Sequence, residues 1–200
     1  MGAVPSRKVT AVHEAGHAVV AAELGVRFEC VSLHPTEAVQ GDIVLSPCEF
    51  TVRPHDLHLA ADRVAREMRK RGAAKADIRA AIDAVQRTPE WREQQRAYFW
   101  NRAAVAIAGL VAAEMETGCR DEGEAVHDRE ALEQLQDWLM ESGADVDRFN
   151  ERAELQARGI LERRRSEVQV VARALATSGR LAEREVLELL RASNRDGTGE

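Results

Sequence analysis

The residues best suited to chemistry lie near the start of the chain, in the stretch His13-Glu14-Ala15-Gly16-His17. This is an H-E-x-x-H pattern. On a helix, a spacing of four places the two imidazoles one turn apart on the same face, where both can bind one metal ion. Glu14 projects beside them and is the expected general base, which takes a proton from a metal-bound water. Zinc is the expected metal, because two imidazoles and a carboxylate suit its tetrahedral site.

The surroundings of the motif favour a helix over residues 9–24, since apolar residues recur there at helical spacing. Ser6 is suited to cap its start and Gly25 to end it. The small residues Ala15 and Gly16 leave room for another segment to approach closely. The five-letter pattern also arises by chance, so this context is what favours a metal site.

A hydrolytic zinc site needs a third protein ligand and one position for water. The third histidine of the longer pattern H-E-x-x-H-x-x-G-x-x-H is absent, because position 23 is Glu23. Glu114 has two interpretations: it orients a ligand imidazole through the second ring nitrogen, or it is a solvated residue near a helix end. Spacing alone does not choose the third ligand among Glu23, His34, Asp42, His55, Asp56, His58, Glu114, Asp121, Glu122, Glu124, His127 and Asp128.

The elements that must position these residues are mainly helical. Two short strand patterns, over residues 28–33 and 42–46, suggest an antiparallel pair. We therefore expect a mainly α fold with a small antiparallel β-sheet next to the motif helix, as one domain over residues 1–192 with a flexible tail over 193–200. Helical patterns follow over residues 56–71, 74–86, 91–116, 127–141, 145–175 and 181–190, with Thr88 and Pro89 at the start of the third.

Several stretches resemble one known family. The stretch His13-Glu14-Ala15-Gly16-His17-Ala18 looks like the motif of the FtsH-type membrane-anchored ATP-dependent zinc proteases. Residues 30–35 and 41–44 are similar to two strands of that family's peptidase domain, and residues 107–114 resemble its helix that ends in A-A-E. Residues 160–175 and 181–190 look like its two closing helices. The resemblance implies metal binding and peptide hydrolysis.

The same resemblance suggests a third ligand. Residues 124–128 resemble the family's G-A-x-N-D segment, whose aspartate is the third zinc ligand, so the match implies Asp128 here. His127 stands in place of the family's asparagine, and Glu124 in place of its glycine. For His127, three roles stay open: a ligand instead of Asp128, a neighbour of the ligands, or a surface residue at a helix start.

Other parts of the family are missing from this sequence. The ATPase module, its G-x-x-x-x-G-K-[ST] phosphate-binding loop and the membrane helices have no counterpart here. The stretch over residues 56–100 is longer than the family's equivalent, and we expect it to be an insertion or a lid over the site. The implied activity is therefore independent of ATP for this chain by itself.

Composition excludes several classes of protein. Of the 200 residues, 44% are apolar, which is too many for a fully disordered chain, and only 4% are aromatic, which favours helices over an all-β fold. The net charge of −6 argues against a nucleic-acid partner. No apolar stretch approaches the roughly 20 residues of a membrane span. Three well-separated cysteines are typical of free thiols in the cytoplasm, where we expect the protein.

These observations favour a zinc-dependent endopeptidase that hydrolyses unfolded or flexible polypeptides. The expected substrate-binding edge strand consists of Asp42, Ile43, Val44 and Leu45, with which an extended peptide could pair. The alternative is a non-catalytic, zinc-containing helical adaptor or interaction module. Glu14 favours the enzyme, because a structural zinc site needs no carboxylate beside its first ligand. Two further partners stay open: a second copy, bound through the apolar stretch 103–113, and a separate unfoldase or regulatory protein.

Overall fold

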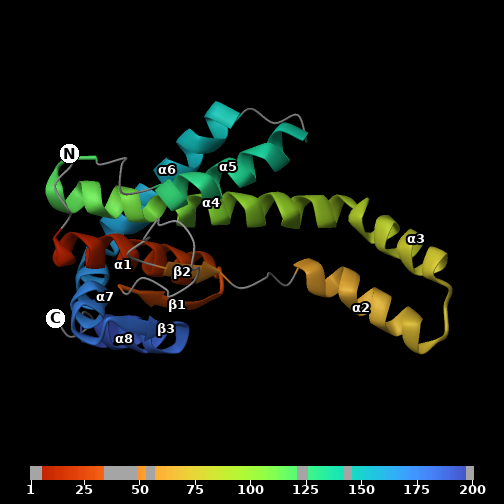
Figure 1. Cartoon of the computed structure of the whole chain (residues 1–200), viewed down its shortest axis with the longest axis horizontal. Coiled ribbons are helices and arrows are strands. Elements are labelled where there is room, and N and C mark those ends of the chain that lie inside the picture. Colours follow the sequence, from red (N-terminus) through yellow and green to blue (C-terminus); the bar gives the residue numbers. More distant parts are fainter. Residues whose placement is uncertain (1–5, 34–48, 53–56, 121–125, 142–145, 197–200) are drawn as a thin grey trace, which may run out of the picture. The chain divides into compact units, whose positions relative to one another are not determined.

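The chain is mainly α-helical and carries one small antiparallel sheet, which confirms the fold class expected from the sequence (Figure 1). The computed structural model describes residues 6–33, 49–52, 57–120, 126–141 and 146–196. The elements in this part are α1 (Arg7–Leu24), β1 (Phe28–Ser32), β2 (Glu49–Val52), α2 (Leu57–Lys70), α3 (Lys75–Gln86), α4 (Pro89–Thr117), α5 (Val126–Glu141), α6 (Val146–Arg163), α7 (Arg165–Ser178), β3 (Arg180–Ala182) and α8 (Glu183–Asp196).

The chain divides into two compact units. The main unit consists of Met1–Arg53 and Asn101–Glu200, and the inserted unit of Pro54–Trp100. The inserted unit covers almost the same residues as the insertion expected over 56–100, and its use as a lid stays a prediction. Helix α4 begins in the inserted unit and continues into the main unit.

The sheet belongs to the main unit and has the strand order β2-β1-β3. Its central strand β1 pairs antiparallel with both neighbours, with Val31 opposite Phe50 on one side and opposite Leu181 on the other. The strand expected over residues 42–46 lies outside the described residues, and β2 was not expected. Strand β3 was also missed, since the sequence predicts helix there. Three residues are too few to show a period-two pattern.

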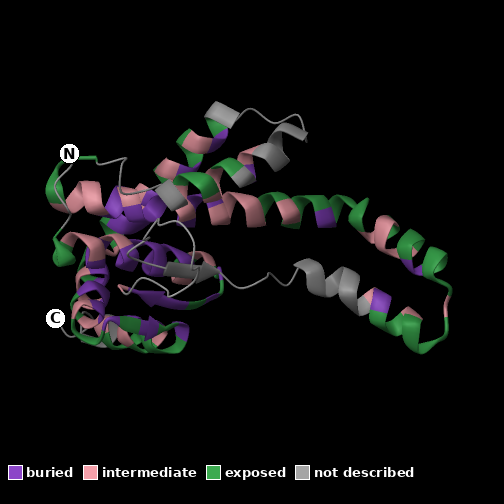
Figure 2. Cartoon of the chain, viewed as in Figure 1, coloured by how far each residue is buried: buried purple, intermediate pink, exposed green. Residues whose placement is uncertain are grey.

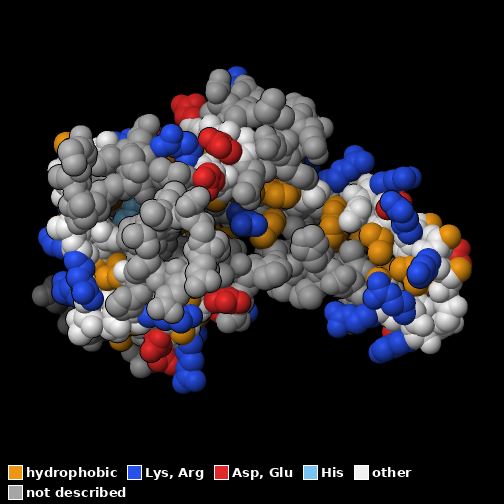
Figure 3. All heavy atoms as spheres, viewed as in Figure 1, with side chains coloured by type: hydrophobic (Ala, Val, Ile, Leu, Met, Phe, Trp, Pro, Cys, Tyr) orange, Lys and Arg blue, Asp and Glu red, His pale blue; other side chains and the backbone are white. Residues whose placement is uncertain are grey.

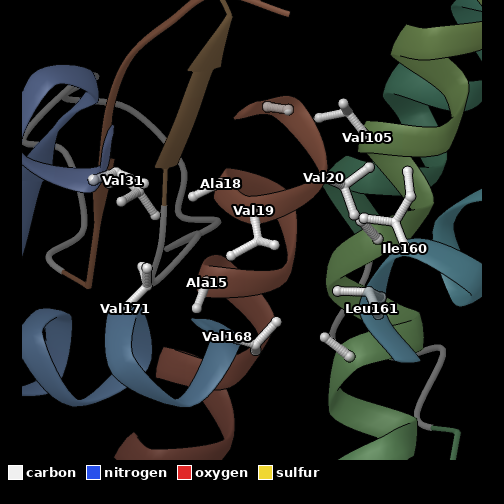
Figure 4. Close-up of a cluster of buried hydrophobic side chains, with 14 of the residues drawn as sticks. Ala15, Ala18, Val19, Val20, Val31, Val105, Ile160, Leu161, Val168 and Val171 are labelled. Atoms are coloured by element: carbon white, nitrogen blue, oxygen red, sulfur yellow. The ribbon is translucent and has the colours of Figure 1, made fainter. Parts of the chain in front are cut away.

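The core of the main unit forms around α1, whose residues from Ala11 to Ala21 are almost all buried (Figure 2). Figure 4 shows how side chains from four other elements meet this helix: Val31 of β1, Val105 of α4, Ile160 of α6 and Val171 of α7. A helix buried on so many sides is held in a fixed position, as a catalytic or metal-binding motif requires.

Two expectations about the C-terminal helices are wrong. The single helix expected over residues 145–175 is divided at Arg164, whose backbone leaves the helical region (φ −109°, ψ 27°). The guanidinium of Arg164 binds Glu167 in the next turn and Glu23 at the end of α1, at 2.6 Å between Nη1 and Oε2. The last helix, expected over residues 181–190, continues to Asp196, because no glycine or proline interrupts it there. Residues 197–200 of the expected flexible tail lie outside the described residues.

The inserted unit is a smaller helical assembly of α2, α3 and the first part of α4. The hydroxyl of Thr88 accepts a hydrogen bond from the backbone N–H of Trp91 at 3.2 Å, which confirms Thr88 as the cap of α4. The indole of Trp91 is buried against Ile82, Val85 and Tyr98. Figure 3 shows Lys and Arg side chains exposed over this unit, in agreement with a solvated surface.

Among the described residues, no helix combines the length and the hydropathy that crossing a bilayer would require. The apolar stretch 103–113, which was considered for self-association, is mostly buried in the core of the main unit. Its apolar character is therefore explained by packing within one chain.

Candidate metal centre

Helix α1 brings His13 and His17 together as the sequence predicts. The helix is capped at its start by the hydroxyl of Ser6 and ends at Gly25, which has a positive φ of 66°. The Nε2 atoms of the two imidazoles lie 3.1 Å apart, and the rings meet edge to face. Two ring nitrogens of a helical i, i+4 pair thus converge on one point.

The orientation of His17 is fixed by the backbone of α4. The ring is buried, with 2% of its surface exposed, and its Nδ1 lies 2.7 Å from the carbonyl oxygen of Val105. Since a carbonyl only accepts hydrogen bonds, Nδ1 is the protonated donor and Nε2 faces His13. A second-nitrogen hydrogen bond of this kind is the usual way in which a ligand imidazole is oriented toward a metal.

A carboxylate from a distant part of the chain completes the cluster. Asp128, in the first turn of α5, lies 3.0 Å from His13 through Oδ2 and 3.2 Å from His17 through Oδ1, measured to the two Nε2 atoms. In a tetrahedral zinc site, bonds of about 2.0–2.1 Å separate any two ligand atoms by about 3.3 Å. The two nitrogens and the carboxylate are therefore spaced as three ligands of one small cation would be.

Glu14 lies beside these donors. Its side chain is buried, with Oε1 3.8 Å from Nε2 of His13. The potential ligand atoms of His13, Glu14 and His17 all lie within 4.8 Å of one another. A carboxylate at this distance can contact a water molecule held by the three ligands, which is the position that a general base needs.

The electrostatics of the cluster favour an ion pair in the metal-free protein. Burial by itself lowers the pKa of His17, but the charge and hydrogen bond of Asp128, aided by Glu14, outweigh it and raise the pKa to about 9. Burial likewise opposes ionisation of Asp128, yet the two histidines hold the pKa of its carboxyl well below the usual range. The site stabilises positive charge, as a site for a divalent cation must.

Helix α4 forms a close wall behind the histidines. A Cβ atom at Gly109 would lie 2.3 Å from Nε2 of His17 and 2.5 Å from Nε2 of His13, which is far inside contact distance. Only glycine leaves space for both imidazoles here. Ala112 lies one turn after Gly109 on α4 and contacts Gly16 of α1. A Cβ at Gly16 would lie 2.6 Å from the Cβ of Ala112, so α1 and α4 touch through small residues.

The role of Gly109 was missed at the level of sequence, where it was only part of a family-like stretch. A signal was present. Glycine costs about 1 kcal/mol relative to alanine inside a helix, and this one lies in an alanine-rich helix with no turn nearby. Such a residue usually has a packing or functional reason.

Two other candidates contact different partners. Glu114 binds the guanidinium of Arg158, with both carboxylate oxygens 3.1–3.2 Å from Nη2. Of the two interpretations left open for Glu114, the one in which it orients a ligand imidazole is wrong for His17, because the carbonyl of Val105 takes that position. Glu23 is paired with Arg164 at the end of α1.

The remaining candidates cannot be placed. His127 belongs to α5, but its side chain lies outside the described residues, as does that of His58. The predicted edge strand Asp42, Ile43, Val44 and Leu45 lies outside them too. The same holds for the other potential ligands His34, His55, Asp56, Asp121, Glu122 and Glu124.

Comparison with protein-family models gave no match for this chain, and no curated protein matches its sequence. The resemblance to FtsH-type peptidases therefore has no support beyond the residues that suggested it. What can be concluded about the site comes from its own geometry.

Proposed function

We propose that this chain is a zinc-dependent endopeptidase with His13, His17 and Asp128 as metal ligands and Glu14 as the general base. The single observation that carries the proposal is the convergence of the two Nε2 atoms and the Asp128 carboxylate within 3.0–3.2 Å of one another. Two histidines with one carboxylate form a donor set that suits zinc and leaves a position for water.

In the proposed reaction, a zinc ion held by His13, His17 and Asp128 would supply Lewis acidity, which polarises a peptide carbonyl and lowers the pKa of a water molecule. Glu14 would take a proton from this water molecule while the water oxygen forms a bond to the carbonyl carbon. Glu14 would then return the proton to the amide nitrogen, and the C–N bond would break to give a free amine and a carboxylic acid, which keeps the second proton of the water. Transfer of that proton from the acid to the amine leaves a carboxylate and an ammonium group. Val105 keeps His17 oriented throughout.

The substrate class is the one that the family resemblance implies for a peptidase domain by itself. No G-x-x-x-x-G-K-[ST] loop occurs within the 200 residues. We propose unfolded or flexible polypeptides as substrates. A separate unfoldase or regulatory protein would extend that range.

The cytoplasm is the proposed location. Cys30 and Cys119 are both free thiols in the described residues, the first buried and the second exposed. Free thiols are typical of a reducing compartment.

The competing interpretation is a non-catalytic adaptor with a structural zinc ion. A structural site usually has four protein ligands. Among the described side chains, three surround the point where the imidazoles converge, and Glu14 lies further from His13, at 3.8 Å. This donor count favours the enzyme.

Cleavage of casein with added zinc tests the proposal. We expect the wild type to cleave it and Glu14→Gln to lose at least about a hundredfold in rate, because the amide keeps the shape of the side chain but cannot accept the proton. Glu23→Gln is the matched control on the same helix and should cleave at the wild-type rate. Equal cleavage by wild type and Glu14→Gln would contradict the assigned mechanism, and zinc binding without cleavage would favour the adaptor.

A further inference from the structure

The positive charge of the inserted unit is concentrated in one short segment. Residues 66–79 form the end of α2, the turn that follows it and the start of α3, and they hold six Lys and Arg but only two Asp and Glu. The other 186 residues of the chain hold 22 Lys and Arg against 32 Asp and Glu. A segment with a net charge of +4 is therefore carried by a chain whose remainder is strongly acidic.

The backbone of this segment is a well-defined turn. The N–H of Ala73 donates to the carbonyl of Met68 at 3.1 Å, the N–H of Gly72 donates to the carbonyl of Arg69 at 3.0 Å, and Gly72 has a positive φ of 72°. This pair of hydrogen bonds is a Schellman motif, which ends α2 and leads directly into α3. The six cationic side chains around the turn are all exposed, and we call them the basic turn: Arg66, Arg69, Lys70, Arg71, Lys75 and Arg79.

Acidic neighbours neutralise little of this charge. Within the part of the chain that the structure describes, one ion pair involves the basic turn: Nη2 of Arg71 lies 3.1 Å from Oε1 of Glu67, and the Arg71 side chain is still 75% exposed. The main unit differs, because several of its cations are paired with glutamates, including Lys8, Arg27, Arg158 and Arg164. The basic turn therefore presents its charge to solvent, where an anionic partner can bind it.

Helix stability explains only part of this pattern. Cations in the last turn of a helix are favourable, because the C-terminal end carries a partial negative charge, and this accounts for Arg69 and Lys70. The reverse holds at the start of α3, where the N-terminal end carries a partial positive charge. Lys75 is the first residue of that helix. An anion bound at the basic turn would offset the unfavourable position of this cation.

The size and charge of the basic turn fit an acidic stretch of polypeptide better than a nucleic acid. The cations on α2 extend over a helical rise of about 7.5 Å, which equals only two to three residues of an extended peptide. Nucleic acids present phosphates over much greater lengths, and a chain whose remaining residues are strongly acidic repels such a long polyanion. Four of the six cations are arginines, whose guanidinium groups bind carboxylates through two parallel hydrogen bonds.

The basic turn also lacks the apolar side chains with which a peripheral helix enters a bilayer. Among the described residues, the only large apolar side chain that is fully exposed is Leu155, which belongs to α6 in the main unit. Membrane-surface helices combine basic residues with an exposed apolar face. The described side chains of the basic turn provide only the first of these two features.

We propose that the basic turn recruits substrates by binding acidic stretches of flexible polypeptides. This inference rests on the proposed function and adds to it a preference for acidic substrates. Binding of one stretch keeps the rest of the same polypeptide at a high local concentration around the enzyme. A flexible chain of about 40 residues has an r.m.s. end-to-end distance of about 35 Å, so the bond that is cleaved can lie far from the stretch that is bound.

Fluorescence anisotropy of two labelled peptides tests the inference. Both peptides are flexible and Gly-Ser-rich, and they differ only in carrying Glu or Gln at the same positions. The protein is the full chain with Glu14→Gln, so that the probe should not be cleaved. We expect it to bind the Glu peptide more tightly than the Gln peptide, and to release the Glu peptide as the ionic strength rises.

Removal of charge from the basic turn should weaken this binding. We expect a loss of about tenfold for the Glu peptide in the triple variant, because each exposed ion pair contributes about 1.4- to 5-fold. A charge-conserving variant at the same positions should bind like the parent protein. The triple variant is Arg69→Gln/Lys70→Gln/Lys75→Gln, and the charge-conserving variant is Arg69→Lys/Lys70→Arg/Lys75→Arg.

The matched control removes three exposed cations of the main unit and so changes the net charge of the chain by the same amount. It should bind the Glu peptide like the parent protein. With Glu14 restored, the triple variant should raise KM for casein, an acidic unfolded protein, and leave kcat unchanged, because none of its positions belongs to the proposed metal centre. The control variant is Arg163→Gln/Arg173→Gln/Arg191→Gln.

The outcomes separate the inference from the proposed function. Equal binding of the two peptides, or equal binding by the triple variant and its control, would refute the recruitment role, whereas casein cleavage that depends on Glu14 would leave the endopeptidase standing. Charge-dependent binding without any cleavage by the wild type would refute the endopeptidase and, with it, the recruitment of its substrates. Tighter binding of a single-stranded oligodeoxynucleotide or of phosphatidylserine vesicles, lost in the triple variant, would overturn the assignment to polypeptides.

Discussion

At the scale of residues, the site depends on three donors from two helices and on neighbours that keep them aligned. The pattern His13-Glu14-x-x-His17 is local, so helical periodicity alone was enough to predict that these side chains share one face. Asp128 lies far along the chain, and spacing could not select it; only the family resemblance implied it. Its contact with both imidazoles is a property of the tertiary fold.

The ion pair between His17 and Asp128 predicts how the metal-free protein responds to pH. The pKa of His17 is raised from 6.5 in the unfolded chain to about 9 in the folded protein. Protonation of His17 therefore stabilises the folded state, with its full effect below pH 6.5, and this stabilisation is lost as the pH rises toward 9. The pKa of Asp128 is lowered, so its contribution is lost only when the pH falls below the ordinary value of 3.8.

We therefore expect the thermal unfolding temperature of the chelator-treated wild type to fall between pH 6.5 and about 9. In Asp128→Asn this part of the pH dependence should largely disappear, because the amide cannot hold the imidazolium. A wild-type profile that rises over the same interval, or one that Asp128→Asn leaves unchanged, would show that the pair is not formed.

At the scale of elements, α4 is the helix whose role in the site the sequence did not predict. Its start at Thr88 was predicted from the capping residue, and Gly118, with a φ of 73°, directly follows its end. Its contacts with α1 were not, because the relevant signals are a backbone carbonyl at Val105 and a missing side chain at Gly109. The carbonyl leaves no signal in the sequence, and the glycine signals a close approach without showing which side chains make it.

Gly109→Ala tests the role of this helix wall. Alanine favours the helix by about 1 kcal/mol over glycine, but its Cβ would overlap both Nε2 atoms, so we expect the variant to fold and to lose most of its zinc affinity. Gly159→Ala is the matched control, because a Cβ there meets only the end of the Arg163 side chain at 3.6 Å in the middle of α6. It should retain wild-type affinity and unfold at a slightly higher temperature. Unchanged zinc binding in Gly109→Ala would mean that the imidazoles bind the metal in another arrangement.

The sheet and the helix break show why some elements could not be predicted. Strand β3 forms because Gly179, with a φ of 76°, ends α7, and because β1 offers an edge for pairing. The break at Arg164 is stabilised by Glu23, which is remote in sequence. Both depend on partners that local periodicity does not contain.

At the scale of the whole molecule, the two units differ in how much apolar surface they bury. The main unit has an extensive core around α1, whereas the described part of the inserted unit buries only Ala65, Ile78 and Trp91. Residues 56–100 were expected to be an insertion because this stretch is longer than its equivalent in the family that the sequence resembles, and the inserted unit occupies almost the same residues. No local sequence pattern predicts whether residues 56–100 cover the site as a lid.

The unequal cores predict unequal protection from hydrogen exchange. In mass-spectrometric exchange of the intact chain, peptides from residues 64–100 should exchange before those from α1 and α7, since few buried contacts oppose local opening in the inserted unit. Zinc should slow exchange in α1 and at the start of α5, where its ligands lie. Equal protection of both units, or no effect of zinc on α1, would contradict this division.

The central claim is that His13, His17 and Asp128 hold one zinc ion with an open position beside Glu14. Anomalous diffraction at the zinc edge, from crystals of the zinc-loaded chain, tests it most directly. The account predicts one ion within about 2.0–2.2 Å of both Nε2 atoms and of the Asp128 carboxylate, with a solvent molecule as fourth ligand near Glu14. An ion held by four protein side chains, or one bound away from the two histidines, would contradict it.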